Sequence, residues 1–285
     1  MPTIDATLVR SLLAEQMPQW KGQPVVPVVP GGWDHVSFRI GTDKVARFPR
    51  ALHYAPQVAK EHRWLPVLGA ALPLPIPTPL HQGQPGQGYP WPWSVYAWID
   101  GQTAAKGPIA NPIGFAHNLV TFLTALNGVD PAGGPRPGLH NFFRGGALAT
   151  YNGETRDAID QLGARIDGRR ALALWERALA TSYTKPPVCL HGDLSSTNLL
   201  VRDGRLHAVI DFGGTAVGDP ACDLTIAWTF LTGAARTAFQ QACPYDEPTW
   251  ARARGSALWK ALIQLAEQEN GTPRRILDTL MAEVP

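Results

Sequence analysis

The sequence predicts an α+β fold with two lobes, a small antiparallel-sheet lobe over residues 1–98 and a larger, mainly helical lobe over residues 99–285. Three observations lead to this prediction. Apolar alternation typical of strands is concentrated in the first hundred residues. Apolar spacing typical of helices dominates after residue 112. The length of 285 residues suits one large domain or two moderate ones.

The first lobe is expected to open with a helix capped by Thr3 or Asp5 and ended by Pro18. Strands are expected over residues 25–29, 35–40 and 44–48, joined by tight turns, with a helix over 57–68 and a strand over 93–99. Residues 73–92 are too rich in proline and glycine to form a helix. The dipeptide Asp100-Gly101 marks a break, so a hinge is expected at about residues 96–101.

The second lobe has helical apolar spacing around one island of short strands. The expected helices cover residues 113–126, 172–180, 223–230 and 257–267, and the expected strands cover 188–190, 199–201 and 206–211. Because Asp203-Gly204 separates the last two strands, they should form a hairpin.

Composition excludes several classes of function. The net charge of +2 gives no whole-chain basic field for nucleic acid or a membrane surface. Three widely spaced cysteines fit neither a disulfide framework nor a zinc site. No apolar run is long enough for a membrane span, and residues 1–20 lack a signal-peptide core. We therefore expect a cytoplasmic protein, either a monomer or a homodimer, that binds neither nucleic acid nor membrane.

The motif with the clearest chemistry runs from His191 to Asn198 and is followed by Asp211 at the end of a strand. A hairpin over residues 199–210 would bring Asn198 and Asp211 side by side at its open end. Carboxylate and amide oxygens suit Mg²⁺ that shares phosphate ligands. Asp193, five residues before Asn198, could then orient a hydroxyl group and accept its proton. This pattern points to phosphoryl transfer.

The spacing resembles the catalytic loop and metal-binding aspartate of kinases, and the glycine after His191 makes it similar to the aminoglycoside phosphotransferase (choline-kinase-like) family. Further stretches that resemble this family lie at residues 30–34, 45–50, 89–96, 141–146 and 218–224. The resemblance spans about residues 25–270. It implies a two-lobe, protein-kinase-like fold and a small-molecule kinase that uses ATP or GTP with Mg²⁺.

The resemblance also implies a nucleotide site. Arg47 should hold the α/β-phosphates, with Glu61 fixing its guanidinium group, and Lys44 is the competing cation. Because the side chains of Lys44 and Arg47 point to opposite faces of a strand, only one of them can face the nucleotide. The remaining expected nucleotide contacts are Gly31 and Gly32 in a turn, and the backbone of Tyr96, Ala97 and Trp98.

The acceptor is expected to be a small hydroxylated molecule, because no peptide-binding motif follows Asp211. Arg144 is a candidate acceptor contact, and Asp246, Glu247, Glu267 and Glu269 could form an acidic pocket for a polycationic antibiotic. Solvated helix faces are an equally good explanation for these carboxylates.

The expected function is transfer of the γ-phosphate to a hydroxyl group, with an aminoglycoside-type antibiotic as one acceptor. Three alternatives stay open at this point. One is a metabolic kinase for an amino alcohol or sugar, and another is a pseudokinase that binds nucleotide without turnover. The third is a hydrolytic metal centre formed by His191, Asp193 and Asp211.

Overall fold

The computed structural model describes residues 3–29, 31–267 and 271–283. The chain divides into two compact units. The first unit comprises Met1–Gly101 and a return segment, Ala208–Gly213, and the second comprises Gln102–His207 and Gly214–Pro285. The return segment, which contains Asp211, was absent from the predicted division at residue 98.

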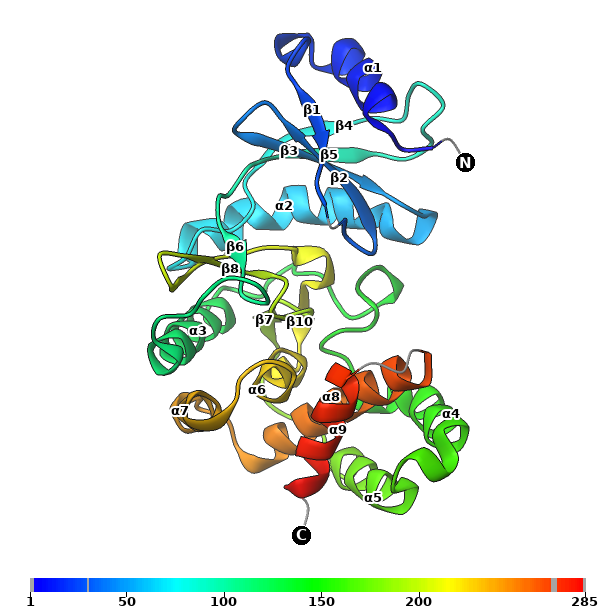
Figure 1. Cartoon of the computed structure of the whole chain (residues 1–285), viewed down its shortest axis with the longest axis vertical. Coiled ribbons are helices and arrows are strands. Elements are labelled where there is room, and N and C mark those ends of the chain that lie inside the picture. The colour runs from blue at the N-terminus through cyan, green and yellow to red at the C-terminus, as the bar shows by residue number, and fades with distance from the viewer. Residues whose placement is uncertain (1–2, 30, 268–270, 284–285) are drawn as a thin grey trace. The chain divides into compact units, whose positions relative to one another are not determined.

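The first unit is built on an antiparallel sheet with the strand order β1-β2-β3-β5-β4 (Figure 1). The strands are β1 (Val25–Pro27), β2 (His35–Ile40), β3 (Lys44–Pro49), β4 (Pro79–Gly83) and β5 (Trp93–Ala97), and the helices are α1 (Ala6–Gln16) and α2 (Pro56–Ala71). Asp5 caps α1 through the N–H groups of Thr7 and Leu8, as one of the two predicted caps. The predicted strands and helices of this unit are therefore confirmed, with small differences at their ends.

The core of the first unit is aromatic. Phe48 of β3 stacks on Trp93 of β5 with ring centroids 4.7 Å apart, and Phe38 and Tyr89 meet Phe48 edge to face. Strand β4 was not predicted, because its proline-rich sequence lacks apolar alternation. Proline is tolerated there because β4 is an edge strand of the sheet.

The second unit is mainly helical (Figure 1). Its helices are α3 (Pro112–Asn127), α4 (Asn152–Leu162), α5 (Gly168–Leu179), α6 (Ile226–Thr229), α7 (Gly233–Ala242), α8 (Glu247–Glu267) and α9 (Gly271–Ala282). Helix α8 packs against α4, α5 and α9. Strand β7 (Val188–Leu190) pairs with β10 (Ala216–Gly218), and β6 (Gln102–Thr103), β8 (Leu199–Arg202) and β9 (Arg205–Val209) form a second small sheet.

Two predicted helices of this unit differ from the structure. The helix expected over residues 257–267 starts ten residues earlier, where Asp246 accepts the N–H of Thr249. The helix expected over residues 223–230 begins with the end of a 3₁₀ turn, Pro220–Thr225, and continues as the short α6. Asp223 in that turn binds the catalytic loop instead of continuing a regular helix. Among the described ranges, no helix is both long enough and apolar enough to cross a membrane.

Candidate active site

In the first unit, Arg47 on β3 lies between two carboxylates. Its Nη2 is 2.7 Å from Asp211 Oδ1, and its Nη1 is 3.5 Å from Glu61 Oε1 on α2. The side chain of Arg47 is only 13% exposed. Burial alone would lower the pKa of this guanidinium, but Asp211 and Glu61 raise it well above the usual value. Arg47 is therefore a fixed cation, and the predicted contact with Glu61 is present.

Glu61 is itself held from a second side. Its carboxylate is 2% exposed and accepts a hydrogen bond from the Tyr96 hydroxyl on β5. Burial and the neighbouring Glu61 charge raise the pKa of Tyr96, so this hydroxyl stays a donor. The Tyr96 side chain consequently has a structural part in the cluster that was not predicted.

Lys44 lies on the other face of β3 and contacts different groups. Its Nζ is 2.5 Å from Asp43 Oδ1 and 5.5 Å from the centroid of the Trp20 ring. Neither Glu61 nor Asp211 is among its ion-pair partners in the described part of the chain. This geometry favours Arg47 over Lys44 as the phosphate-binding cation.

Further charged groups surround Arg47. His35 Nδ1 lies 3.1 Å from Asp34 Oδ1 and 3.5 Å from Arg47 Nη2. Burial opposes ionisation of Asp34, but the hydrogen bond to His35 and the charges of His35 and Arg47 lower its pKa to about 2. Lys60 donates to the carbonyl of Gly213, and burial lowers its pKa to about 8. Lys60 thus ties α2 to the segment that carries Asp211.

Two of the N–H groups in the predicted hinge are engaged within the structure, and a contact of the hinge carbonyl groups with a base stays a prediction. The N–H of Ala97 donates to Thr78 O at 2.9 Å, and the N–H of Trp98 donates to Asp43 O at 2.8 Å. These two groups are already used by the sheet and its turn, so neither is available as a donor to adenine. The next N–H group along the chain, that of Ile99, has no acceptor among the described residues.

The glycine turn is described only in part, since Pro30 lies outside the described residues. A Cβ on Gly32 would lie 3.2 Å from the His35 carbonyl, and one on Gly31 would lie 3.5 Å from Arg50 Nη2. The turn therefore leaves limited space for a side chain at Gly32. A nucleotide contact at this turn stays a prediction.

In the second unit, Asp193 is held through both carboxylate oxygens. Lys260 Nζ on α8 is 2.9 Å from Oδ1, and Asn198 Nδ2 donates to Oδ2 at 3.3 Å and to the Asp193 carbonyl at 2.9 Å. Burial would raise the pKa of Asp193, but the charge and hydrogen bond of Lys260 lower it below the usual value. The side chain is still 41% exposed. Asp193 is therefore an oriented, ionised and accessible carboxylate at neutral pH.

The loop that carries Asp193 is held in place by hydrogen bonds to Asp223. Its two oxygens accept the N–H groups of His191 and Gly192, both at 2.7 Å. His191 is fully buried, and its Nδ1 accepts the N–H of Asp193 at 3.2 Å. Gly192 has a φ of 85°, and a Cβ there would lie 2.1 Å from the Gly214 carbonyl. Only glycine fits at this position.

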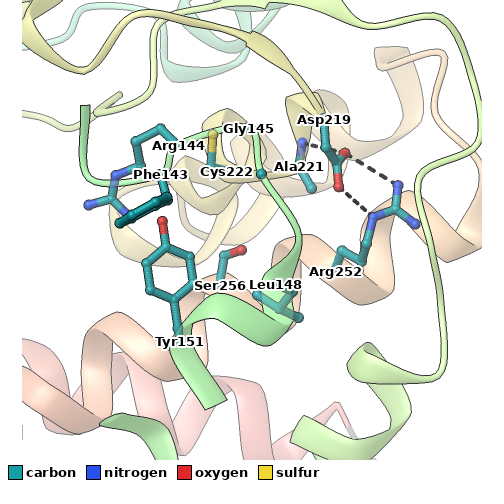
Figure 2. Close-up of a pocket in the computed structure, with 11 residues that line it drawn as sticks. Phe143, Arg144, Gly145, Leu148, Tyr151, Asp219, Ala221, Cys222, Arg252 and Ser256 are labelled. Carbon is teal, nitrogen blue, oxygen red and sulfur yellow. Dashed lines mark hydrogen bonds and ion pairs between the residues drawn. The ribbon is translucent and has the colours of Figure 1, made fainter. Parts of the chain in front are cut away.

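Two small adjoining pockets, each with room for about one water molecule, lie near the catalytic loop, and both are lined by Arg144, Cys222 and Ser256. The first also contains Phe143, Tyr151 and Arg252, and the second contains Asp193, Trp259 and Lys260. Figure 2 shows the first pocket, in which Arg252 and Asp219 pair on one side while Arg144 lies on the other. Arg144 is thus placed beside the catalytic loop, and its contact with an acceptor stays a prediction.

The acidic residues expected around the acceptor lie elsewhere. Asp246 caps α8 and is 2.8 Å from Lys185 Nζ, and Glu247 is 2.7 Å from Arg254 Nη1. Glu267 is exposed at the end of α8, and Glu269 lies outside the described residues. None of the three described carboxylates lines either of the pockets at Asp193. Lys260 is among the pocket residues that sequence reasoning missed, since no local motif distinguishes it from a solvated helix lysine.

The donor atoms of Asn198 and Asp211 fit a hard cation. Because the Asn198 amide group donates to Asp193, its carbonyl oxygen is left as the acceptor. Asp211 has a left-handed φ of 67° and a side chain 29% exposed, and only one of its oxygens is bound by Arg47. The described residues contain no cluster of three His, Cys, Asp or Glu side chains arranged for a metal, so a hydrolytic centre of that kind gains no support. Asn198 and Asp211 belong to different units, and their joint role as Mg²⁺ ligands stays a prediction.

Comparison with known proteins extends this description. The model of the phosphotransferase enzyme family matches residues 25–256. An aminoglycoside 3′-phosphotransferase from Escherichia coli is 32% identical over 74 residues, which are 26% of this chain and 27% of that protein. The chain therefore spans about a quarter of the length of this curated relative.

Solved structures show the same fold at lower identity. The GDP complex of wild-type aminoglycoside 2′-phosphotransferase-IIIa superposes with a TM-score of 0.74 and 20% identity, covering 98% of this chain and 99% of that one. A macrolide 2′-phosphotransferase type I superposes with a TM-score of 0.62 and 19% identity, covering 99% and 97%.

Proposed function

Because this chain belongs to the phosphotransferase enzyme family, we propose that it transfers the γ-phosphate of ATP or GTP to a hydroxyl group of a small molecule. The observation that carries the proposal is the arrangement at Asp193. An ionised carboxylate, held by Lys260 and Asn198 but still accessible, lies in the wall of a pocket. A group of this kind can orient an acceptor hydroxyl and receive its proton as the oxygen attacks phosphorus.

The nucleotide is assigned to the first unit. Arg47 supplies a cation for the α/β-phosphates, and its guanidinium is kept in place by Glu61 and Asp211. Arginine can bind phosphate oxygens through two parallel N–H groups, which suits this position. The adenine or guanine base is assigned to the hinge after Trp98, where the N–H of Ile99 has no described acceptor.

Asn198 and Asp211 would hold Mg²⁺ through their oxygens, and the ion would neutralise charge on the transferred phosphate. Arg47 pairs with only one oxygen of Asp211, Oδ1, so the other carboxylate oxygen is left for the ion. We further propose that the protein acts in the cytoplasm as a monomer or homodimer. The three free cysteines are consistent with a reducing compartment.

The test is Asp193→Ala, measured as acceptor-stimulated release of ADP from MgATP. The acceptor panel should include aminoglycosides, macrolides, amino alcohols, sugars and sugar acids. We expect a loss of about 10²–10⁴-fold in kcat for any acceptor that stimulates the wild type. Asp157→Ala, an exposed aspartate on α4, is the matched control and should keep full activity. Unchanged turnover in Asp193→Ala would exclude the assignment.

A further inference from the structure

The pockets beside Asp193 contain three cationic side chains, and their partners differ. Lys260 is paired with Asp193 at 2.9 Å, and Arg252 is paired with Asp219 at 2.6 Å. No carboxylate in the described part of the chain lies within ion-pair distance of Arg144, the residue shared by both pockets. The two pockets together therefore carry one cation more than the carboxylates that line them.

Arg144 is fixed by aromatic rings instead of by an anion. Its guanidinium carbon lies 5.0 Å from the centroid of Trp259 and 5.9 Å from that of Tyr151. Its Nε is buried without a hydrogen-bond partner. A guanidinium that is partly removed from water normally acquires an anionic partner, because desolvating an unpaired charge is costly.

The nearest anion in the same pocket is Asp193, whose pKa is lowered by Lys260 and also by the charge of Arg144, but Asp193 forms its ion pair with Lys260 and not with Arg144. The other neighbouring titratable groups do not supply a direct partner for Arg144. Burial raises the pKa of the Cys222 thiol well above its usual value, so the thiol stays neutral beside Arg144. Burial also raises the pKa of Tyr151 against the opposing charge and hydrogen bond of Arg144, so the phenol is a neutral contact of Arg144, and its hydroxyl donates to Phe142 O at 2.6 Å. Glu154, an exposed carboxylate on α4, accepts the indole N–H of Trp259 at 2.9 Å. Asp223 is used by the catalytic loop, as described above.

The segment that presents Arg144 is held in an unfavourable backbone conformation. Phe142 and Phe143 both adopt left-handed φ values, 55° and 60°, which are costly for residues other than glycine. Asn141 is fully buried and anchors the segment by accepting from the Gly138 N–H at 2.9 Å. Its amide donates to Arg136 O at 3.1 Å and Thr215 O at 3.3 Å. The position of Arg144 is thus imposed by the fold.

We propose that Arg144 binds an anionic group of the acceptor, so that the preferred acceptor is a hydroxylated molecule with a carboxylate or phosphate and not a polycation. This inference rests on the proposed phosphotransferase function and specifies its substrate class. Arg144 binds the anion from above the Trp259 ring, and Lys260 adds a second positive charge next to Asp193. A polycationic aminoglycoside would place its ammonium groups against both cations.

The test is direct binding to the full-length protein, measured by isothermal titration with three related sugars. D-glucuronate, D-glucose and D-glucosamine share a pyranose ring and are anionic, neutral and cationic, and kanamycin serves as the polycation. We expect glucuronate to bind at least tenfold more tightly than glucose or glucosamine. Arg144→Gln should remove that advantage, and Arg144→Lys should retain most of it. Arg177→Gln, an exposed arginine on α5, makes the same change of charge outside the pockets and should have no effect.

Three results would overturn the inference. Tighter binding of glucosamine or kanamycin than of glucuronate is one, and an undiminished glucuronate advantage in folded Arg144→Gln is another. The third is the absence of glucuronate binding to the wild type in the millimolar range. Since the titration needs no turnover, it is independent of the Asp193→Ala experiment. A failure of the proposed function and a failure of this inference are therefore distinguishable.

Discussion

Replacing Asp223 with asparagine should separate the stability of the catalytic loop from its chemistry. The Asp223 side chain is 1% exposed and accepts two backbone N–H groups at 2.7 Å, those of His191 and Gly192. Asparagine has nearly the same shape, so it creates no cavity. It keeps one acceptor oxygen and directs an NH₂ group at the other N–H, which leaves that donor buried without a partner.

The magnitude follows from this geometry. A hydrogen bond to a charged group contributes about 1.5–3 kcal/mol, and an unsatisfied buried donor costs about 1–3 kcal/mol. Burial raises the pKa of Asp223, which means that the carboxylate itself is costly to bury and offsets part of this loss. We therefore expect the free energy of unfolding to fall by about 2–3 kcal/mol. We also expect kcat to fall by about 10²-fold, because a small displacement of Asp193 has that effect on positioned groups.

The assays are urea unfolding followed by circular dichroism and acceptor-stimulated ADP release. Asp167→Asn is the matched control, since Asp167 caps α5 through the N–H of Arg170 at 3.0 Å and asparagine is an equally good cap. That variant should retain both stability and turnover. The reasoning that Asp223 holds the catalytic loop would be refuted if the Asp223→Asn protein kept both its kcat and its free energy of unfolding, the latter to within about 0.5 kcal/mol of the wild type.

Three further variants test the charged groups around Asp193 and around Arg47. Lys260→Gln should move the acidic limb of the kcat/KM pH profile to higher pH, because loss of the cation raises the pKa of Asp193, whereas Lys185→Gln should leave that limb in place. Arg47→Met should lower the free energy of unfolding by about 3 kcal/mol, measured by urea titration, since Glu61 is then buried without its cation. Asp34→Asn should lower the free energy of unfolding by about 2 kcal/mol at pH 7, because the pKa of Asp34 falls from 3.8 to about 2 on folding. The difference between variant and wild type should shrink as the pH falls from about 4 towards 2, and a difference that is independent of pH would contradict this reasoning.

The parts of the fold that sequence predicted correctly are those where local pattern and burial agree. Strand β3 was predicted over residues 44–48, and its side chains alternate there between buried and partly exposed positions. The helices α2 and α3 follow from apolar residues on one face. The edge strand β4 has no such pattern, because an edge strand needs only one partner strand and tolerates a proline at its first residue, Pro79.

In the candidate site, too, contacts within a short motif could be predicted and contacts that depend on tertiary packing could not. Asp193 and Asn198 lie in one short motif, so their contact follows from five residues of sequence. Lys260 reaches Asp193 across 67 residues and from a different helix. No periodicity or motif marks such a contact, since it depends on how α8 packs against the rest of the unit. Tyr96 and Glu61 were each predicted as nucleotide contacts, but their mutual hydrogen bond also depends on tertiary packing.

Charge at the acceptor site shows why position matters more than composition. Counted along the sequence, residues 219–285 contain eight acidic and six basic groups, which favoured an acidic pocket. In the structure, Asp246 and Glu247 are neutralised by Lys185 and Arg254 outside the pockets. Arg144, which lies outside that stretch, remains as the pocket cation without an ion pair to a carboxylate in the described chain. Because Coulomb interactions with a ligand fall off with distance and with solvent screening, this single guanidinium outweighs several paired surface carboxylates. The positive charge of Arg144 should therefore select an anionic acceptor, and the titration with glucuronate, glucose and glucosamine measures that preference.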